Sequence, residues 1–321
     1  MTQVDHLSAE ASRRPTILEA YRETFLNVVR SPVTWIIVAI MLVSAIYMVL
    51  VGQTRLMLNG LISTPFNLIF ALIIIPLTIG KPKAPWENPP AYSRQRLWVQ
   101  LGGCLLLILL LQVFLILIFD LFNLRSAGIP LLSPLAAYMY AQLQARNYLF
   151  LLPVAVMLET ILPLGLMRSL GARWQELGFC KGYHIWRVTL VLSAVYLVFF
   201  AIAIGSGKAS IFTILGGIGV NFFEDGLVEE TLFRGVVMTR LTQLFGVAWG
   251  IGLSALLFGL GHFSITMHAL HNDVALSLAY VFVHYGMNGV FAGFFLLRPR
   301  NLVPMVISHT LGDAAIPYLP I

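Results

Sequence analysis

Charged residues are scarce in this sequence. Lysine, arginine, aspartate and glutamate make up 11% of its 321 residues, whereas an average soluble domain carries about a quarter. Hydrophobic residues reach 59%, and several apolar runs are about 20 residues long, the length that crosses the hydrocarbon core of a bilayer. A soluble globular domain and a disordered chain are therefore both excluded. The runs are continuous and do not alternate with polar residues, which also argues against a transmembrane β-barrel.

Further absences concern reactive groups. Cys104 and Cys180 are the only cysteines and stand far apart, so neither a disulfide framework nor a thiolate metal site is indicated. The sequence holds no GxSxG elbow for a serine nucleophile and no HExxH zinc motif. Carboxylates and imidazoles remain as the groups that carry chemistry.

The apolar runs predict the fold class. We expect an all-α protein, a polytopic transmembrane helical bundle with about nine spans. The second run is interrupted by Asn59, Pro65, Asn67 and Pro76, and the bundle has eight spans if this run is re-entrant. The runs lie near residues 33–52, 60–80, 98–120, 147–167, 188–206, 210–240, 246–263, 274–297 and 302–319.

The basic residues predict the orientation. With nine spans, 16 of the 20 lysines and arginines fall on one side of the membrane, as the positive-inside rule expects for a cytoplasmic N-terminus and an external C-terminus. Topology therefore explains the net charge of +6, and nucleic acid is not a predicted partner. Residues 1–31 lack the apolar core and cleavage site of a secretory signal peptide. We expect a multi-pass protein of a bacterial inner membrane.

The sixth run contains charged residues that need a reason. Four of the 14 acidic residues fall between Glu224 and Glu230, and an ionisable group within a span costs about 2.5 to 3.5 kcal/mol on insertion scales. Glu230 and Arg234 have the i,i+4 spacing of an intrahelical ion pair, which is a structural reading. Glu229 points roughly 100° away and is expected to face a polar cavity, where a carboxylate suits general-base work.

Histidines on later spans supply partners. If the sixth and seventh runs form a hairpin that turns at Phe245–Gly246, Glu229 lies 16 positions before the turn and His262 lies 17 after it. Equal rise per residue then brings the two level on antiparallel helices. Two further pairs on the last runs are spaced i,i+4, namely His284 with Asn288 and His309 with Asp313. Each pair projects into a common cavity or bridges helices, and spacing does not choose between these readings.

Three segments resemble a known family. The segments are EETLFR at Glu229–Arg234, FGLGH at Phe258–His262 and HTLGD at His309–Asp313. They are similar to the EExxxR, FxxxH and HxxxN/D motifs of the CAAX prenyl protease type II family, also called the ABI or CPBP family. The resemblance covers roughly residues 210–319, and the preceding residues add only hydropathy.

The resemblance implies an intramembrane endopeptidase of the glutamic type. It implies that Glu229 activates the attacking water with the aid of His262. Glu230 and Arg234 would hold the motif helix in register and tune Glu229.

The last motif departs from the family pattern. By the resemblance, His309 and Asp313 occupy positions that stabilise the oxyanion of the tetrahedral intermediate. Eukaryotic members carry Asn at the last position, whereas an aspartate donates a hydrogen bond only when it is protonated. Asp313 would instead orient His309, and Asn288 is a further candidate donor.

The resemblance and the apolar runs together divide the chain into four parts. Residues 1–31 form a cytoplasmic segment, 32–97 hold the first spans and a proline-rich cytoplasmic loop, 98–206 hold the middle spans, and 207–321 form a CAAX protease-like catalytic core. The expected partners are the bilayer and a membrane-embedded or lipid-anchored peptide substrate.

No cofactor is expected, although zinc is a rival. Three imidazoles and two carboxylates from different helices form a conceivable zinc site. Metal-independent glutamate catalysis is favoured because HExxH is absent. The external cluster His268, His271 and Asp273 is read as a solvated loop rather than a chelator.

Two other functions are compatible with these residues. A non-enzymatic membrane scaffold or bacteriocin-immunity protein would use the same fold without catalysis. A proton-coupled transporter also places acids and histidines in a bundle, but no inverted repeat is visible. One geometric conflict remains, since His309 lies only nine residues after Arg300, about 13 Å of helix, whereas Glu229 is much farther from its own turn.

Overall fold

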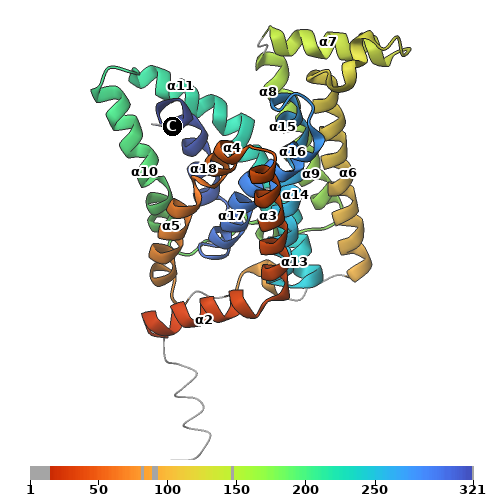
Figure 1. Ribbon diagram of the computed structural model, residues 1–321. Coiled ribbons are helices and arrows are strands. Elements are labelled where there is room, and N and C mark those ends of the chain that lie inside the picture. Colours follow the sequence, from red (N-terminus) through yellow and green to blue (C-terminus); the bar gives the residue numbers. More distant parts are fainter. Residues whose placement is uncertain (1–14, 81–82, 89–92, 146–147, 320–321) are drawn as a thin grey trace, which may run out of the picture.

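Within the described residues, the chain is a bundle of helices. The computed structural model describes residues 15–80, 83–88, 93–145 and 148–319, and every regular element in these ranges is helical. Seven helices are long and apolar enough to cross a membrane, or eight if the bent pair α14 (Val247–Gly261) and α15 (Phe263–Ala269) is counted as one. The predicted all-α polytopic bundle is confirmed (Figure 1).

The candidate spans coincide with eight of the nine predicted runs. Two are composite, because α4 (Thr54–Leu61) and α5 (Thr64–Leu77) form a single 24-residue span, and α16 (Val274–Val281) continues through a π-helical turn into α17 (Met287–Leu297). The others are α3 (Pro32–Leu50), α6 (Arg94–Ile118), the segment Leu152–Ser169 within α8 (Tyr148–Val156) to α9 (Leu162–Ser169), α10 (Ile185–Gly205) and the long helix Ile211–Phe245.

The ninth predicted span is wrong. Residues 302–319 form α18 (Val303–Ala315), which has 13 residues and is followed by the short 3₁₀ turn Ile316–Tyr318. At 1.5 Å per residue this helix is about 20 Å long, too short for the hydrocarbon core. It packs against α10 and the long helix, so its apolar residues are buried by protein.

The long helix Ile211–Phe245 carries the first motif and is irregular. It runs from α11 (Ile211–Asn221) through η5 (Phe222–Gly226), α12 (Leu227–Glu229) and η6 (Glu230–Met238) to α13 (Thr239–Phe245), and η5 and η6 are π-helical. π-Helical turns occur mostly inside α-helices and often at functional sites. Every residue of η6 is buried, so the motif lies in the centre of the bundle.

A glycine allows α18 to contact this helix closely. A Cβ atom on Gly226 would lie 2.1 Å from Thr310 Oγ1 and 2.8 Å from the carbonyl oxygen of Val306. Both distances are too short for a side chain at residue 226. The backbones of η5 and α18 therefore approach closely enough for the side chains of α18 to reach the motif helix.

The predicted hairpin between the sixth and seventh runs is confirmed. Helix α13 ends at Phe245 and α14 begins at Val247, with Gly246 between them at φ 89°, a conformation that glycine adopts without strain. Helix α14 then bends by 41° at His262 into α15.

The turn between α17 and α18 lies beside the motif helix and is covered by residues 170–184. Leu302 donates its backbone N–H to the carbonyl of Gly178 at 3.1 Å, and a Cβ on Gly235 would lie 3.0 Å from Leu302 Cδ1. Gly235 is only six positions after Glu229. The last helix therefore starts deep in the bundle, which resolves the conflict over the level of His309.

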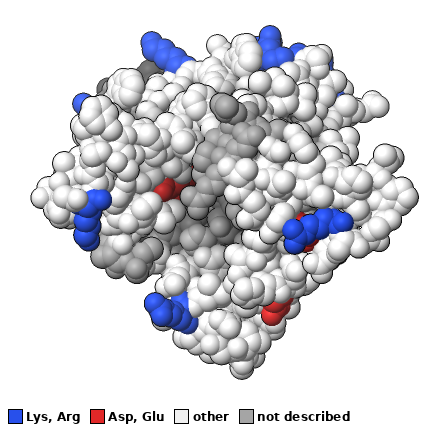
Figure 2. Space-filling view, turned by 90° about the horizontal axis from the view of Figure 1, so that it is seen from above, with Lys and Arg blue, Asp and Glu red and all other residues white. Residues whose placement is uncertain are grey.

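A helix at one end lies across the spans. Helix α2 (Ile17–Arg30) has an apolar and a polar face, and none of its residues is buried (Figure 1). The opposite end carries few charges, with separate basic groups and a few acidic ones, one of them near the centre of the view (Figure 2). Residues 1–14 of the predicted cytoplasmic segment lie outside the described residues, as do Arg13, Arg14, Lys81 and Arg146 of the charge pattern.

Candidate active site

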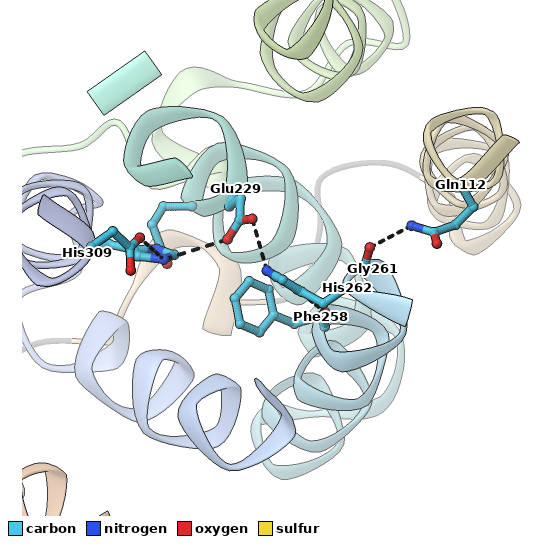
Figure 3. A network of polar contacts seen from close by, with 8 residues as sticks. Gln112, Glu229, Phe258, Gly261, His262 and His309 are labelled. Carbon is cyan, nitrogen blue, oxygen red and sulfur yellow. Dashed lines mark hydrogen bonds and ion pairs between the residues drawn. The ribbon is translucent and has the colours of Figure 1, made fainter. Parts of the chain in front are cut away.

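Glu229 lies between two imidazoles. It is the last residue of α12, where the motif helix becomes π-helical. Its Oε1 is 3.1 Å from His262 Nε2 and its Oε2 is 3.7 Å from His309 Nε2 (Figure 3). The fold thus brings together one carboxylate and two histidines from three different helices.

His262 is held in a defined orientation. Its Nδ1 is 2.9 Å from the carbonyl oxygen of Phe258, and because a carbonyl only accepts hydrogen bonds, Nδ1 carries a proton. Nε2 faces Glu229 Oε1, and a hydrogen bond between them requires a proton either on Nε2 or on the carboxylate. The ring of Tyr285 stacks on the imidazole, with centroids 3.8 Å apart and planes inclined by 18°.

His309 contacts two further carboxylates. Its Nδ1 is 2.8 Å from Glu230 Oε1 and its Nε2 is 3.1 Å from Asp313 Oδ2. Ionised carboxylates are acceptors, so each ring nitrogen has a partner for a proton. This arrangement suits an imidazolium, whose positive charge would then lie beside Glu229.

The predicted ion pair within the motif is present. Glu230 Oε2 is 3.4 Å from Arg234 Nε, and the two side chains are 1% and 2% exposed. The Arg234 guanidinium also lies 3.9 Å above the ring of Phe258, the residue whose carbonyl accepts from His262. Because buried charges require partners, this group fixes the motif helix against α14.

Two buried carboxylate oxygens of the site have no hydrogen-bond partner among the described residues, namely Glu229 Oε2 and Glu230 Oε2. Glu230 Oε2 lies beside Arg234, whereas Glu229 Oε2 lies on the side of His309. The side chains of His309 and Asp313 are 21% and 29% exposed, so the site is accessible from their side. A hydrogen-bond donor that enters from there would find Glu229 Oε2 available.

His284 and Asn288 contact the second span instead of Glu229. Asn288 Oδ1 accepts from Ser63 Oγ at 2.7 Å and from Asn67 Nδ2 at 3.1 Å. His284 Nδ1 is 3.1 Å from the carbonyl oxygen of Gly60. These two residues therefore bind the interrupted second span where α4 meets α5, which is the helix-bridging alternative.

Two residues of the site escaped the sequence reasoning. Tyr285 carries no signal beyond its position next to His284. Gln112 does carry one, because it is the single strongly polar side chain in the apolar stretch 105–118, and a polar side chain within a span requires a partner. Its amide contacts the bend beside His262 (Figure 3).

Two groups of residues are possible metal ligands, the histidines and carboxylates of the site and the loop 268–273. In the described part of the chain, no group of three or more His, Cys, Asp or Glu side chains has an arrangement that could hold a metal ion. In the loop 268–273, Asp273 instead accepts from the backbone N–H of Leu276 at 2.9 Å and caps α16. His268 stacks on Phe119 with centroids 4.8 Å apart.

Comparison with known families agrees with this geometry. Residues 211–315 match the family model described as type II CAAX prenyl endopeptidase Rce1-like. The chain carries an Rce1-like domain. This domain extends from the start of α11 to the end of α18 and includes Glu229, His262 and His309.

The match confirms the resemblance that the three motifs indicate. The matched family is described as a type II CAAX prenyl endopeptidase family, and the chain that carries this domain has seven or eight candidate membrane-spanning helices. The Rce1-like domain occupies about a third of the chain. No curated protein and no solved structure matches the chain.

Proposed function

We propose that the protein is an intramembrane endopeptidase in which Glu229 and His262 activate a water molecule. The substrate is a membrane-embedded or lipid-anchored peptide or protein. The position of the Glu229 carboxylate, 3.1 Å from His262 and 3.7 Å from His309, carries this proposal. A general base must lie within hydrogen-bond reach of the proton that it takes. Oε2 of Glu229, which accepts no hydrogen bond from the described residues, meets that requirement for an entering water.

The site residues divide the steps of hydrolysis. Glu229 takes the proton of the water as its oxygen attacks the carbonyl carbon of the scissile bond, and His262 stabilises the carboxylate in position. The positive charge of His309, supported by Glu230 and Asp313, favours the developing oxyanion. The proton held by Glu229 then passes to the leaving amine, which restores the carboxylate.

The mechanism requires no metal ion. Zinc ligation by the imidazoles is the rival, and the two are separated by dialysis of the purified protein against a strong chelator. Cleavage that survives chelation supports the glutamate mechanism. Cleavage that is lost and then restored by zinc alone would contradict it.

The proposed setting is the bacterial inner membrane, with the N-terminus cytoplasmic and the C-terminus outside. Although α18 is too short to cross alone, it starts inside the bundle and runs in the same direction as α10, since Ser308 contacts Leu192 and Ala315 clusters with Phe200. The chain therefore ends on the side where α10 ends.

Single cysteines placed near Arg30 and near Tyr318, in a chain that lacks Cys104 and Cys180, would report sidedness by labelling of intact cells. Labelling of both from the same side would contradict this orientation.

The decisive experiment removes the charge of Glu229. The Glu229→Gln variant, reconstituted in vesicles with a library of membrane-anchored peptides, should lose about 10²- to 10⁴-fold in cleavage rate, the usual contribution of a general base. Glu224→Gln is the matched control, since Glu224 lies on the same helix but is exposed. Unchanged cleavage in the Glu229 variant would overturn the proposal.

The same variant separates the non-catalytic alternatives. A scaffold or immunity protein keeps its phenotype in Glu229→Gln. A proton-coupled transporter shows altered proton flux into vesicles and no cleavage in any variant.

A further inference from the structure

Gln112 connects a separate span to the site. It lies on α6, and its side chain reaches α14 and α15 where they meet (Figure 3). The amide Nε2 donates to the carbonyl of Gly261 at 2.6 Å. The amide Oε1 accepts from Ser264 Oγ at 2.8 Å and from Ser264 N at 3.4 Å.

These contacts flank the bend at His262. A bend of 41° interrupts the regular backbone ladder, and within a membrane each unpaired backbone group costs several kcal/mol. Gln112 binds the carbonyl of Gly261, directly before His262, and the backbone N–H of Ser264, two residues after it. The amide nitrogen of Gln112 thus binds the chain before His262, and the amide oxygen binds the chain after it.

The bend determines where the imidazole lies. The ring of His262 is bound to its own helix through Phe258, so the ring moves with the end of α14. Gln112 holds the carbonyl of Gly261, the last residue of α14. A displacement of that end therefore changes the distance from His262 Nε2 to Glu229 Oε1, which is 3.1 Å. A displacement of about 1 Å at a catalytic group costs about 10²-fold in rate.

We propose that Gln112 is a positioning residue, which fixes the bend between α14 and α15 and thereby sets His262 against Glu229. This inference rests on the proposed function. A merely stabilising Gln112 would affect the stability of the fold, whereas a positioning Gln112 affects the rate through the placement of His262.

Kinetics of paired variants test the inference. Gln112→Leu should lower kcat about 10- to 100-fold with KM changed less than about twofold, and Ser264→Ala should lower kcat in the same direction by less. Leu109→Ala, on the exposed side of α6, is the control and should match the parent. In a His262→Ala background, Gln112→Leu should cause no further loss. A second full loss there would overturn the inference, as would an unchanged kcat in Gln112→Leu.

A spectroscopic measurement distinguishes this inference from the proposed function. In protein labelled with ¹⁵N-histidine, the ring nitrogens of His262 report its tautomer and its contact with Glu229 whether or not a substrate is cleaved. Gln112→Leu should change the His262 signals and leave those of His184 unchanged. Unchanged His262 signals would overturn the inference. If the parent protein cleaves no substrate while these signals shift, only the proposed function fails.

Misfolding of Gln112→Leu would not end the test. Ser264→Ala removes one contact and keeps the bond to Gly261. The same comparison of kcat and His262 signals then applies to that variant, and an unchanged pair of readouts would overturn the inference.

Discussion

Glu230 Oε1 lies 2.8 Å from His309 Nδ1, and the two residues are 79 positions apart in the chain. The contact joins the motif helix to the last helix of the bundle. Glu230 is 1% exposed and also pairs with Arg234. One buried carboxylate therefore stabilises two cationic groups, while its neighbour Glu229 remains open to the site.

Removal of that carboxylate should destabilise the fold. Glu230→Gln leaves the buried Arg234 without its ionic partner, and breaking a buried pair costs about 3 to 5 kcal/mol. Thermal unfolding in detergent micelles measures the effect. The double variant Glu230→Gln with Arg234→Met should be less destabilised than the sum of the two single variants, and additive losses would contradict the pairing.

Contact between α18 and the motif helix should depend on Gly226. Gly226→Ala places a methyl group 2.1 Å from Thr310 Oγ1, and overpacking of this kind costs about 1 to 3 kcal/mol. We expect a lower unfolding temperature and a large loss of cleavage, because His309 moves away from Glu229. Gly219→Ala on the same helix meets nothing within 4 Å and serves as the control. Equal behaviour of the two variants would refute the close approach.

The role of Asp313 can be read from two substitutions. Asp313→Asn keeps an oxygen that accepts from His309 Nε2 and adds an amide donor for the oxyanion, so its cleavage rate should stay within about tenfold of the parent. Asp313→Leu removes the acceptor beside His309 Nε2 and should lose about 10²- to 10³-fold, because His309 is the group proposed to stabilise the oxyanion. Initial rates on one substrate suffice. An asparagine variant as inactive as the leucine variant would show that the carboxylate charge is required.

The cover over the α17–α18 turn should show in the reactivity of Cys180. Burial raises the pKa of the Cys180 thiol above its ordinary value of 9.0, and Arg300 opposes the shift. The thiol also donates to the carbonyl of Arg300 at 2.6 Å. The thiolate is the reactive form, so maleimide should label native Cys180 more slowly than the unfolded protein in a Cys104→Ala background.

The direction of the pH effect follows from that shift. A raised pKa means that the fold favours the protonated thiol, so the associated stability is complete below pH 9 and is lost as the pH rises through the shifted pKa. Labelling of native protein should therefore keep accelerating at a pH well above 9, where the labelling of unfolded protein has levelled off. Identical pH profiles for native and unfolded protein would contradict the burial of this turn.

The meeting of Glu229 and His262 could be predicted from the sequence. A tight turn at Gly246 and a constant rise per residue bring the two residues level, and the structure places their side chains 3.1 Å apart. The i,i+4 pair of Glu230 and Arg234 was equally predictable. Both inferences depend on one helix or one hairpin, in which local geometry decides the outcome.

Contacts between distant segments could not be predicted. Hydropathy gave residues 302–319 the appearance of a span, whereas α18 is short and starts beside Gly235 under the cover of residues 170–184. The binding of Asn288 to Ser63 and Asn67 depends on the packing of α4 and α5. Such contacts come from the packing of separate helices, which periodicity does not encode.

The turn between α17 and α18 is bound by residues that lie outside the Rce1-like domain. The backbone of Leu302 and the carbonyl of Arg300 bind Gly178 and Cys180, which precede residues 211–315. The carbonyl of Gly261 likewise depends on α6. A polypeptide trimmed to residues 211–315 would leave these groups without their partners inside the membrane. We therefore expect residues 211–315 not to fold on their own. A chimera that joins them to spans of another protein should need the upstream helices as well.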